Sequence, residues 1–270
     1  MDETSSGPSV GEPVSAVATL VRAPNPGPMT LDGTNSFVLR APGAAGCVVV
    51  DPGPDDAGHL ARLAADGPVE LVLVTHHHAD HTEGVARFAA MTDAPVRAID
   101  RRLCLGAPPL SDRERIKVAG LEIEVVATPG HTADSVCFVL PADAALGVKD
   151  AILTGDTILG RGTTIISDPD GALGPYLSSL ERLRALGSEA PVLVLPGHGP
   201  VLPDLAEICD AYLAHRAERI EQIRAALAEL GADASTAAVT DLVYADKDAS
   251  VRSAAEASVR AQLRYLRGTA

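Results

Sequence analysis

A short histidine-rich segment, His76-His77-His78-Ala79-Asp80-His81, constrains the fold and chemistry of this chain more than any other feature. It follows directly on an apolar run, residues 70–74, that has the composition of a buried strand. Imidazole and carboxylate groups are the ligands that zinc and similar divalent metals prefer in proteins. Because a loop at a strand end can direct alternate residues toward one centre, the segment predicts a metal site, with His77 pointing away from it.

Three further candidate ligands also stand just after apolar runs, each beside a glycine. They are His131 in Thr-Pro-Gly-His, Asp156 in Thr-Gly-Asp and His198 in Pro-Gly-His. Glycine permits the tight turns and close backbone approach that a crowded metal centre needs. We therefore expect four strand ends to bring ligands to one edge. The expected ligand set is His76, His78, Asp80, His81, His131, Asp156 and His198.

The rest of the chain predicts an α/β fold in which helices cover the faces of sheets. The expected strands cover residues 35–39, 47–50, 70–74, 121–127, 136–140, 151–153 and 192–195, and the expected helices cover 57–65, 83–91 and 175–186. These elements place a main, catalytic domain over residues 14–203. Residues 204–270 have a helical pattern and predict a small C-terminal module. Residues 1–13 are polar and rich in Gly, Pro and Ser, which predicts a flexible tail.

The ligand pattern resembles that of the metallo-β-lactamase superfamily. The matching motif is Thr75-His76-x-His78-x-Asp80-His81, followed in order by the three later ligands. The resemblance implies an αββα sandwich with two divalent metal ions at the edge between its sheets. It also implies a division of the ligands: His76, His78 and His131 for the first ion, Asp80, His81 and His198 for the second, and Asp156 as a bridge.

Two positions help to predict which metal ions the site binds. The commonest zinc lactamases resemble this pattern but have a cysteine where Asp156 stands, and the flavodiiron branch has a glutamate where His78 stands. The bridging carboxylate favours a balanced two-metal site, and the histidine disfavours a redox di-iron enzyme. We expect two Zn²⁺ ions, with Mn²⁺ or Fe²⁺ as alternatives.

Two adjacent cations lower the pKa of a bridging water and polarise a carbonyl or phosphoryl oxygen. We therefore expect a hydrolase whose nucleophile is a metal-bridging hydroxide. Asp80 and Asp156 are the expected catalytic side chains, with Asp80 orienting the hydroxide and moving its proton. A metal-stabilised interaction module is the competing interpretation. It is disfavoured because a structural zinc site needs only four ligands, whereas seven ligands around two ions leave room for substrate.

A closer resemblance is to the β-lactamase-like protein 2 group. It rests on Gly33-Thr34-Asn35, on residues 155–164, on Tyr176-x-x-Ser179-Leu180 and on His215-Arg216-x-x-Arg219 in the tail. The resemblance implies a winged-helix-like C-terminal module and cleavage of single-stranded RNA. On this basis an endoribonuclease-like phosphodiesterase is the first functional prediction.

Charge and composition argue against RNA. The formal charge is −14, and 27 acidic but only 14 basic residues precede residue 210. Such a surface repels polyanions. Aromatic residues make up 3% of the chain, without tryptophan, so no platform for stacking bases is evident. Arg260, Arg264 and Arg267 recur on one helical face, but such a stripe is usually a solvated face.

The alternative is a hydrolase of a small ester, thioester or lactone that resembles glyoxalase II, with lactam hydrolysis as an incidental activity. An acidic protein suits a small ligand. The basic cluster with which glyoxalase II holds glutathione is not evident in the tail, where Lys247 is the only lysine. Both substrate classes therefore remain open.

Several further side chains receive weaker predictions. Thr163 and Thr164, in a glycine-flanked loop after Asp156, could contact substrate, as could Tyr176; a plain loop is the alternative. Asp51 is expected to make hydrogen bonds behind the metal ligands. His59 and His215 lie in helical segments and are expected to be ordinary exposed or capping residues.

The start of the chain lacks the basic and apolar segments of a signal peptide, and no apolar run is long enough to span a bilayer. The four cysteines are far apart and predict separate reduced thiols. Together these features predict a cytoplasmic protein that does not enter a membrane. The sequence predicts no particular oligomeric state.

Overall fold

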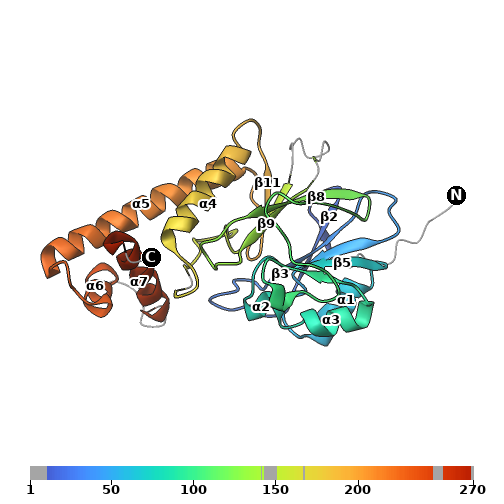
Figure 1. Cartoon of the computed structure of the whole chain (residues 1–270), viewed down its shortest axis with the longest axis horizontal. Helices are drawn as coiled ribbons and strands as arrows, with labels where there is room; N and C mark the ends of the chain where they lie inside the picture. Colours follow the sequence, from blue (N-terminus) through green and yellow to red (C-terminus); the bar gives the residue numbers. More distant parts are fainter. Residues whose placement is uncertain (1–10, 141, 143–150, 167, 246–251, 269–270) are drawn as a thin grey trace.

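The computed structural model describes residues 11–140, 142, 151–166, 168–245 and 252–268. Two sheets face each other, and helices cover their outer faces (Figure 1). The first sheet has the order β1-β2-β3-β4-β5-β6: β1 (Glu12–Pro13), β2 (Ala18–Arg22), β3 (Asn35–Leu39), β4 (Cys47–Val50), β5 (Val69–Leu73) and β6 (Val96–Arg97). The second has the order β11-β10-β9-β8-β7: β7 (Arg115–Val118), β8 (Leu121–Ala127), β9 (Val136–Leu140), β10 (Ala151–Gly155) and β11 (Leu193–Pro196).

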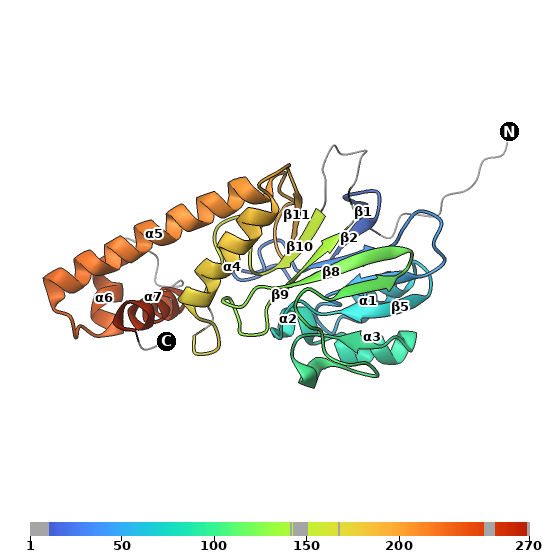
Figure 2. The same ribbon diagram turned by 45° about the horizontal axis from the view of Figure 1, so that its top comes forward.

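The helices are α1 (Ala57–Ala64), α2 (Ala79–Thr82), α3 (Val85–Thr92), α4 (Leu173–Leu186), α5 (Leu205–Leu230), α6 (Thr236–Val243) and α7 (Arg252–Arg267), with a 3₁₀ turn, η1, at Arg101–Leu103. α1 and α3 lie on the outer face of the first sheet, and α4 and the first half of α5 lie on that of the second (Figures 1 and 2). The expected αββα sandwich is confirmed.

Strand periodicity explains the layers. In β4, Val48 and Val50 belong to the core between the sheets, whereas Cys47 and Val49 pack under α1 and α3. In β9, Phe138 faces the same central core and Cys137 faces α4. Because successive side chains of a strand point to opposite faces, a run that is apolar throughout is covered on both sides.

The C-terminal part is helical, as expected. Leu205 and Tyr212 of α5 pack on the second sheet, and Ile223, near the other end of the same helix, packs with α6 and α7. Figure 2 shows α5 as the element that joins these two regions. The described residues between 204 and 268 contain no strand, so they show no β-hairpin of the kind that forms a wing.

The structure differs from expectation at residues 12 and 13 and at His59. Residues 1–10 of the expected tail lie outside the described residues, but Glu12 and Pro13 pair with β2 as a short strand. His59 is fully buried rather than exposed, since it lies with Leu60 and Leu63 on the buried side of α1, and its Nε2 lies 2.9 Å from the hydroxyl of Ser36 on β3. Strands β1, β2, β6 and β7 were not anticipated.

The described cysteine thiols are unpaired, as predicted. None of the helices in the described parts of the chain combines the length and the apolar character that a bilayer span requires.

The topology brings the carboxyl ends of several strands to one edge. β4 and β5 are parallel in the first sheet, as are β10 and β11 in the second, and β8 runs in the same direction as β10 because β9 is antiparallel to both. Backbone hydrogen bonds from Val136 to Thr75 and from Asn35 to Gly197 join the sheets at this edge. The loops that leave it are the ones that carry the predicted ligands.

Candidate metal centre

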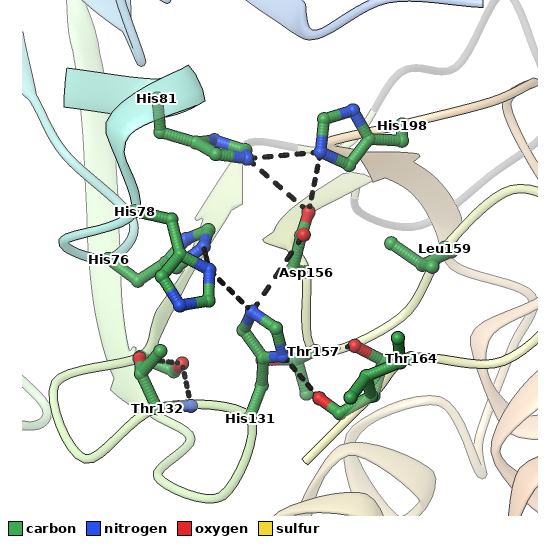
Figure 3. Close-up of polar contacts among 12 residues, drawn as sticks. His76, His78, His81, His131, Thr132, Asp156, Thr157, Leu159, Thr164 and His198 are labelled. Carbon is green, nitrogen blue, oxygen red and sulfur yellow. Dashed lines mark hydrogen bonds and ion pairs between the residues drawn. The ribbon is translucent and has the colours of Figure 1, made fainter. Parts of the chain in front are cut away.

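All seven predicted ligands converge at this edge, in two groups. His76, His78, His131 and Asp156 form one, and Asp80, His81 and His198 form the other; within each group the potential ligand atoms lie within 4.8 Å of one another. Figure 3 labels all of these residues except Asp80. The first four ligand positions follow β5, and the others follow β8, β10 and β11. The prediction that four strand ends supply one edge is confirmed.

The nitrogen atoms of the first group are spaced as metal ligands are. His78 Nδ1 lies 3.1 Å from His76 Nε2 and 3.1 Å from His131 Nε2. Two nitrogens bound to one tetrahedral zinc at about 2.05 Å are about 3.3 Å apart. These imidazoles therefore converge on a point that a divalent ion fits.

The second group has the same spacing. His81 Nε2 lies 3.2 Å from His198 Nε2, and Asp80 Oδ2 lies 3.0 Å from His198 Nε2. Two imidazoles and one carboxylate are a donor set that suits zinc and similar borderline metals.

Asp156 stands between the groups. Its Oδ2 lies 3.8 Å from His131 Nε2, while its Oδ1 lies 3.4 Å from both His81 Nε2 and His198 Nε2. Oδ1 is buried and has no hydrogen-bond partner. A buried carboxylate oxygen without a donor is costly unless a cation or a proton satisfies it. The geometry therefore fits a carboxylate shared by two metal ions.

Hydrogen bonds behind the ligands fix which nitrogen faces the centre. The Nδ1 of His81 donates to Asp51 Oδ2 at 2.8 Å, and that of His131 donates to the carbonyl oxygen of Ile165 at 2.6 Å. Asp51 also accepts from the backbone N and the hydroxyl of Thr75, and that hydroxyl lies 3.1 Å from His76 Nδ1. These contacts leave Nε2 free to bind a metal. The expected supporting role of Asp51 is confirmed.

Two glycines permit the crowding. A Cβ on Gly155, whose φ is +48°, would lie 2.6 Å from Thr75 Oγ1. A Cβ on Gly197 would lie 2.6 Å from Asp156 Oδ1 and 2.8 Å from His81 Cε1. A side chain at either position would displace the groups that form the centre.

The pKa values of the histidines are lowered in the first group and raised in the second. Burial, together with the nearby His131, lowers the pKa of His78 to about 4. Burial also opposes a charge on His198, but the neighbouring carboxylates of Asp156 and Asp80 raise its pKa to about 9. Likewise, burial acts to lower the pKa of His81, but Asp51 and Asp156 raise it well above its ordinary value. The carboxylates are thus concentrated around the second group.

The three predicted substrate contacts lie in different environments. Thr163 is half-buried on a cavity wall, whereas Thr164 is buried and its hydroxyl lies 3.2 Å from His131 Nδ1 (Figure 3). Tyr176 is fully buried, and its hydroxyl donates to the carbonyl oxygen of Thr157 at 2.7 Å. Tyr176 thus supports the loop after Asp156 and does not reach a substrate.

The contacts of His77 and of the α7 arginines test two further predictions about residues outside the centre. His77 points away from the ligands and lies 2.8 Å from Asp134 Oδ1, as its place in the motif suggested. Arg260 and Arg264 both pair with the carboxylate of Asp168, at 3.2 and 2.7 Å. Arg267 donates to the carbonyl oxygens of Ala232 and Ala234. The arginine stripe is therefore an exposed face, as expected, whose charges also make contacts within the protein.

Asn35 supports the centre, a role that the sequence did not predict. Asn35 is buried, and its Nδ2 donates to the carbonyl oxygens of Pro196 and Gly199, at 2.9 Å each. It thereby holds the loop that carries His198. The motif Gly33-Thr34-Asn35 was visible in the sequence, but its position at the junction of the two sheets depends on the tertiary fold.

An αββα sandwich with two such ligand groups at its edge defines a class of metal-dependent hydrolases. The family model of the metallo-beta-lactamase superfamily matches residues 29–198, and the chain belongs to that superfamily. It is 32% identical over 268 residues to the beta-lactamase-like protein 2 homolog of Caenorhabditis elegans, covering 94% of this chain and 85% of that protein.

Two further similarities are informative. The chain is 32% identical to an atrochrysone carboxyl ACP thioesterase of Aspergillus chevalieri, over 77% of this chain and 65% of that protein, so it spans slightly less than two thirds of that relative. A solved beta-lactamase domain protein from Burkholderia ambifaria is 25% identical with a TM-score of 0.74, over 98% of this chain and 91% of that one.

Proposed function

We propose that this hydrolase cleaves thioesters of small acyl groups, using two Zn²⁺ ions held by the seven ligands. The observation that carries the two-metal proposal is the placement of Asp156, with one carboxylate oxygen toward each group of histidines. Two divalent ions, when bound there, would polarise the acyl oxygen and lower the pKa of water.

The carboxylates of the centre have different exposures and therefore different proposed roles. The side chain of Asp156 is 11% exposed and keeps the two ligand groups together. That of Asp80 is 28% exposed, with Oδ2 within 3.5 Å of both His81 Nε2 and His198 Nε2. A carboxylate that is both at the centre and reachable from solvent can orient a water molecule and accept its proton. We assign that role to Asp80.

The choice of a thioester rests on charge and on a relative. Arg260 and Arg264 pair with Asp168, and Arg267 donates to backbone carbonyl oxygens, which weakens the attraction of this exposed stripe for a nucleic acid. The net charge of −14 disfavours RNA further. A relative that is 32% identical is an ACP thioesterase.

Single-stranded RNA is the competing substrate. Its support is the likeness to the β-lactamase-like protein 2 group, which covers nearly the whole chain. The same centre would serve a phosphodiester, since two cations neutralise developing phosphoryl charge as well as acyl charge.

One assay separates these proposals. The zinc-loaded protein is given an acyl thioester, a lactone and a labelled single-stranded RNA, beside a variant with Asp80→Ala and Asp156→Ala as the control for contaminating enzymes. We expect thioester hydrolysis that the control lacks. Metal-dependent cutting of RNA, absent from the control and unaccompanied by thioester turnover, would overturn the thioester proposal.

A further inference from the structure

A second site lies beyond the metal centre, where the loop after Asp156 meets the C-terminal helices. It is a cavity of about 240 Å³. It is smaller than the ~300–1,000 Å³ typical of whole-ligand pockets, so it suits one end of a molecule. It is lined by residues 163–165, by α5 and the end of α6, and by α7; its polar side chains are Thr163, Thr164, His215, Arg216, Arg219, Tyr244 and Ser258.

Arg216 is a charged side chain that is only 3% exposed. One of its terminal nitrogens donates to the carbonyl oxygen of Thr164, and its guanidinium lies over the ring of Tyr176, 5.2 Å from the ring centroid. Its Nε is buried and has no hydrogen-bond partner. Burying an arginine with an unsatisfied donor is unfavourable unless an anion compensates for it. Arg216 also lines the cavity, where a bound anion would compensate for its positive charge.

The other groups around the cavity also favour negative charge. Arg219, one helical turn further along α5, is held 5.0 Å from the ring centroid of Tyr244 and donates to Gln222. Ala254 and Ala255 place the first turn of α7 on the wall, where helix dipoles favour anions. No Asp or Glu is among the lining residues that the structure describes, although the chain as a whole carries a formal charge of −14.

One short segment, Thr164-Ile165, lies between the cavity and the metal centre. Thr164 and Ile165 line it on one side, while the Thr164 hydroxyl and the Ile165 carbonyl oxygen contact His131 Nδ1 on the other. Figure 3 shows Thr164 beside His131. A ligand in the cavity therefore lies beyond the residues that support a metal ligand. This is the position of a remote group of a substrate whose reacting bond is at the metals.

We propose that this cavity binds a phosphate group of the substrate. This inference rests on the proposed thioesterase function. Two guanidinium groups, an imidazole, hydroxyls and a helix N-terminus match an anion with several acceptor oxygens better than a single carboxylate. Thioesters of phosphopantetheine, free or as part of a larger carrier, have a phosphate at the end of the arm opposite the acyl group. They form the substrate class that would engage both sites.

The test compares two substrates that differ only by that phosphate: acetyl-phosphopantetheine and acetyl-pantetheine. For the zinc-loaded protein we expect a kcat/KM about tenfold or more higher with the phosphorylated thioester, mainly through KM. Arg219→Gln should bring the ratio close to one. Arg224→Gln removes the same charge from an exposed position on the same helix, and should leave the ratio unchanged. A wild-type ratio near one, or a ratio that Arg219→Gln does not alter, would overturn the proposal.

Titration calorimetry of inorganic phosphate binding to the metal-loaded protein tests the phosphate site independently of catalysis. The metals can bind phosphate too, so the informative quantity is the component lost in Arg219→Gln and kept in Arg224→Gln. If that component is present but neither thioester is hydrolysed, the phosphate site stands and the thioesterase function fails. If single-stranded RNA displaces that component and is cut, the phosphate belongs to RNA, which overturns the assigned substrate class.

Discussion

The two halves of the metal centre contain similar ligands but are supported from behind by different partners. In the first half, His131 donates to a backbone carbonyl oxygen and lies beside the Thr164 hydroxyl, and both partners are neutral. In the second half, His81 donates to the carboxylate of Asp51. A carboxylate behind an imidazole makes it a more basic and more firmly oriented ligand. The comparison indicates that residues behind the ligands would set the properties of each proposed metal position.

Removal of the Asp156 carboxylate, which both halves share, should have the largest effect on activity. In Asp156→Ala both groups lose a ligand, so we expect hydrolysis to fall by roughly a thousandfold or more, because several kcal/mol of transition-state stabilisation depend on the metals. Activity assays combined with elemental analysis of metal content provide the check. Retention of two metals per chain and full turnover would show that Asp156 does not bridge.

Asp80→Asn should separate chemistry from metal binding. The amide retains an oxygen near His198 but cannot accept a proton, so we expect kcat to fall by roughly a hundredfold with both metals bound. Steady-state kinetics on a variant with verified metal content measure this. If such a variant had unchanged turnover, the proton-accepting role of Asp80 would be wrong.

Asp51→Asn should weaken the second half more than the first, because Asp51 contacts His81 directly but reaches His76 only through the Thr75 hydroxyl. Asp51 has a positive φ of +51°, which asparagine tolerates, so the backbone can remain in place. We expect the affinity for one of the two metals to fall by roughly 10- to 100-fold and the affinity for the other to fall by less. A competition titration with a chromophoric chelator resolves the two affinities. Equal weakening of both would contradict the division into halves.

Thr164→Val is the matched change in the first half and should have a smaller effect. His131 keeps its 2.6 Å hydrogen bond to Ile165, so we expect less than about a tenfold loss of affinity at one metal position. The same chelator titration applies. A loss as large as that of Asp51→Asn would mean that the two halves are supported equally.

His59, which supports β3 beneath the edge, should affect stability but not catalysis. Burial and the neighbouring Arg62 lower its pKa from 6.5 to about 4. A lowered folded-state pKa means that its contribution is fully present above pH 6.5 and is lost as the pH falls toward 4, by up to roughly 3 kcal/mol. Urea unfolding of the metal-loaded protein should show this decline, and His59→Gln should reduce it. Identical pH dependence in both proteins would exclude the effect.

The ligands and most of the sheet were predictable because their signals are local. His76, His78, Asp80 and His81 lie within six residues of one another, directly after a strand, and β3, β4, β8 and β9 have the bounds that their apolar runs indicate. The burial of His59 was not predictable, because its partner Ser36 comes from a different strand. Strand β7, Arg-Ile-Lys-Val, was missed because half of its side chains are charged and its single partner lies on one side.

The cavity beside Arg216 shows the same limit. Its lining is drawn from residues between 163 and 258, so no short motif indicates it. In the sequence, the arginines of the tail look alike. The fold distinguishes Arg260 and Arg264, which pair with Asp168, from Arg216, which is buried with an unsatisfied Nε. Such differences arise only when distant segments meet.

The central claim is that two metal ions act together in one centre. Metal-free protein titrated with Zn²⁺, with hydrolysis of the acyl thioester followed at each addition, tests it most directly. The account predicts that activity reaches its maximum at two equivalents of metal per chain. Maximal activity at one equivalent, with no change on addition of the second, would contradict it.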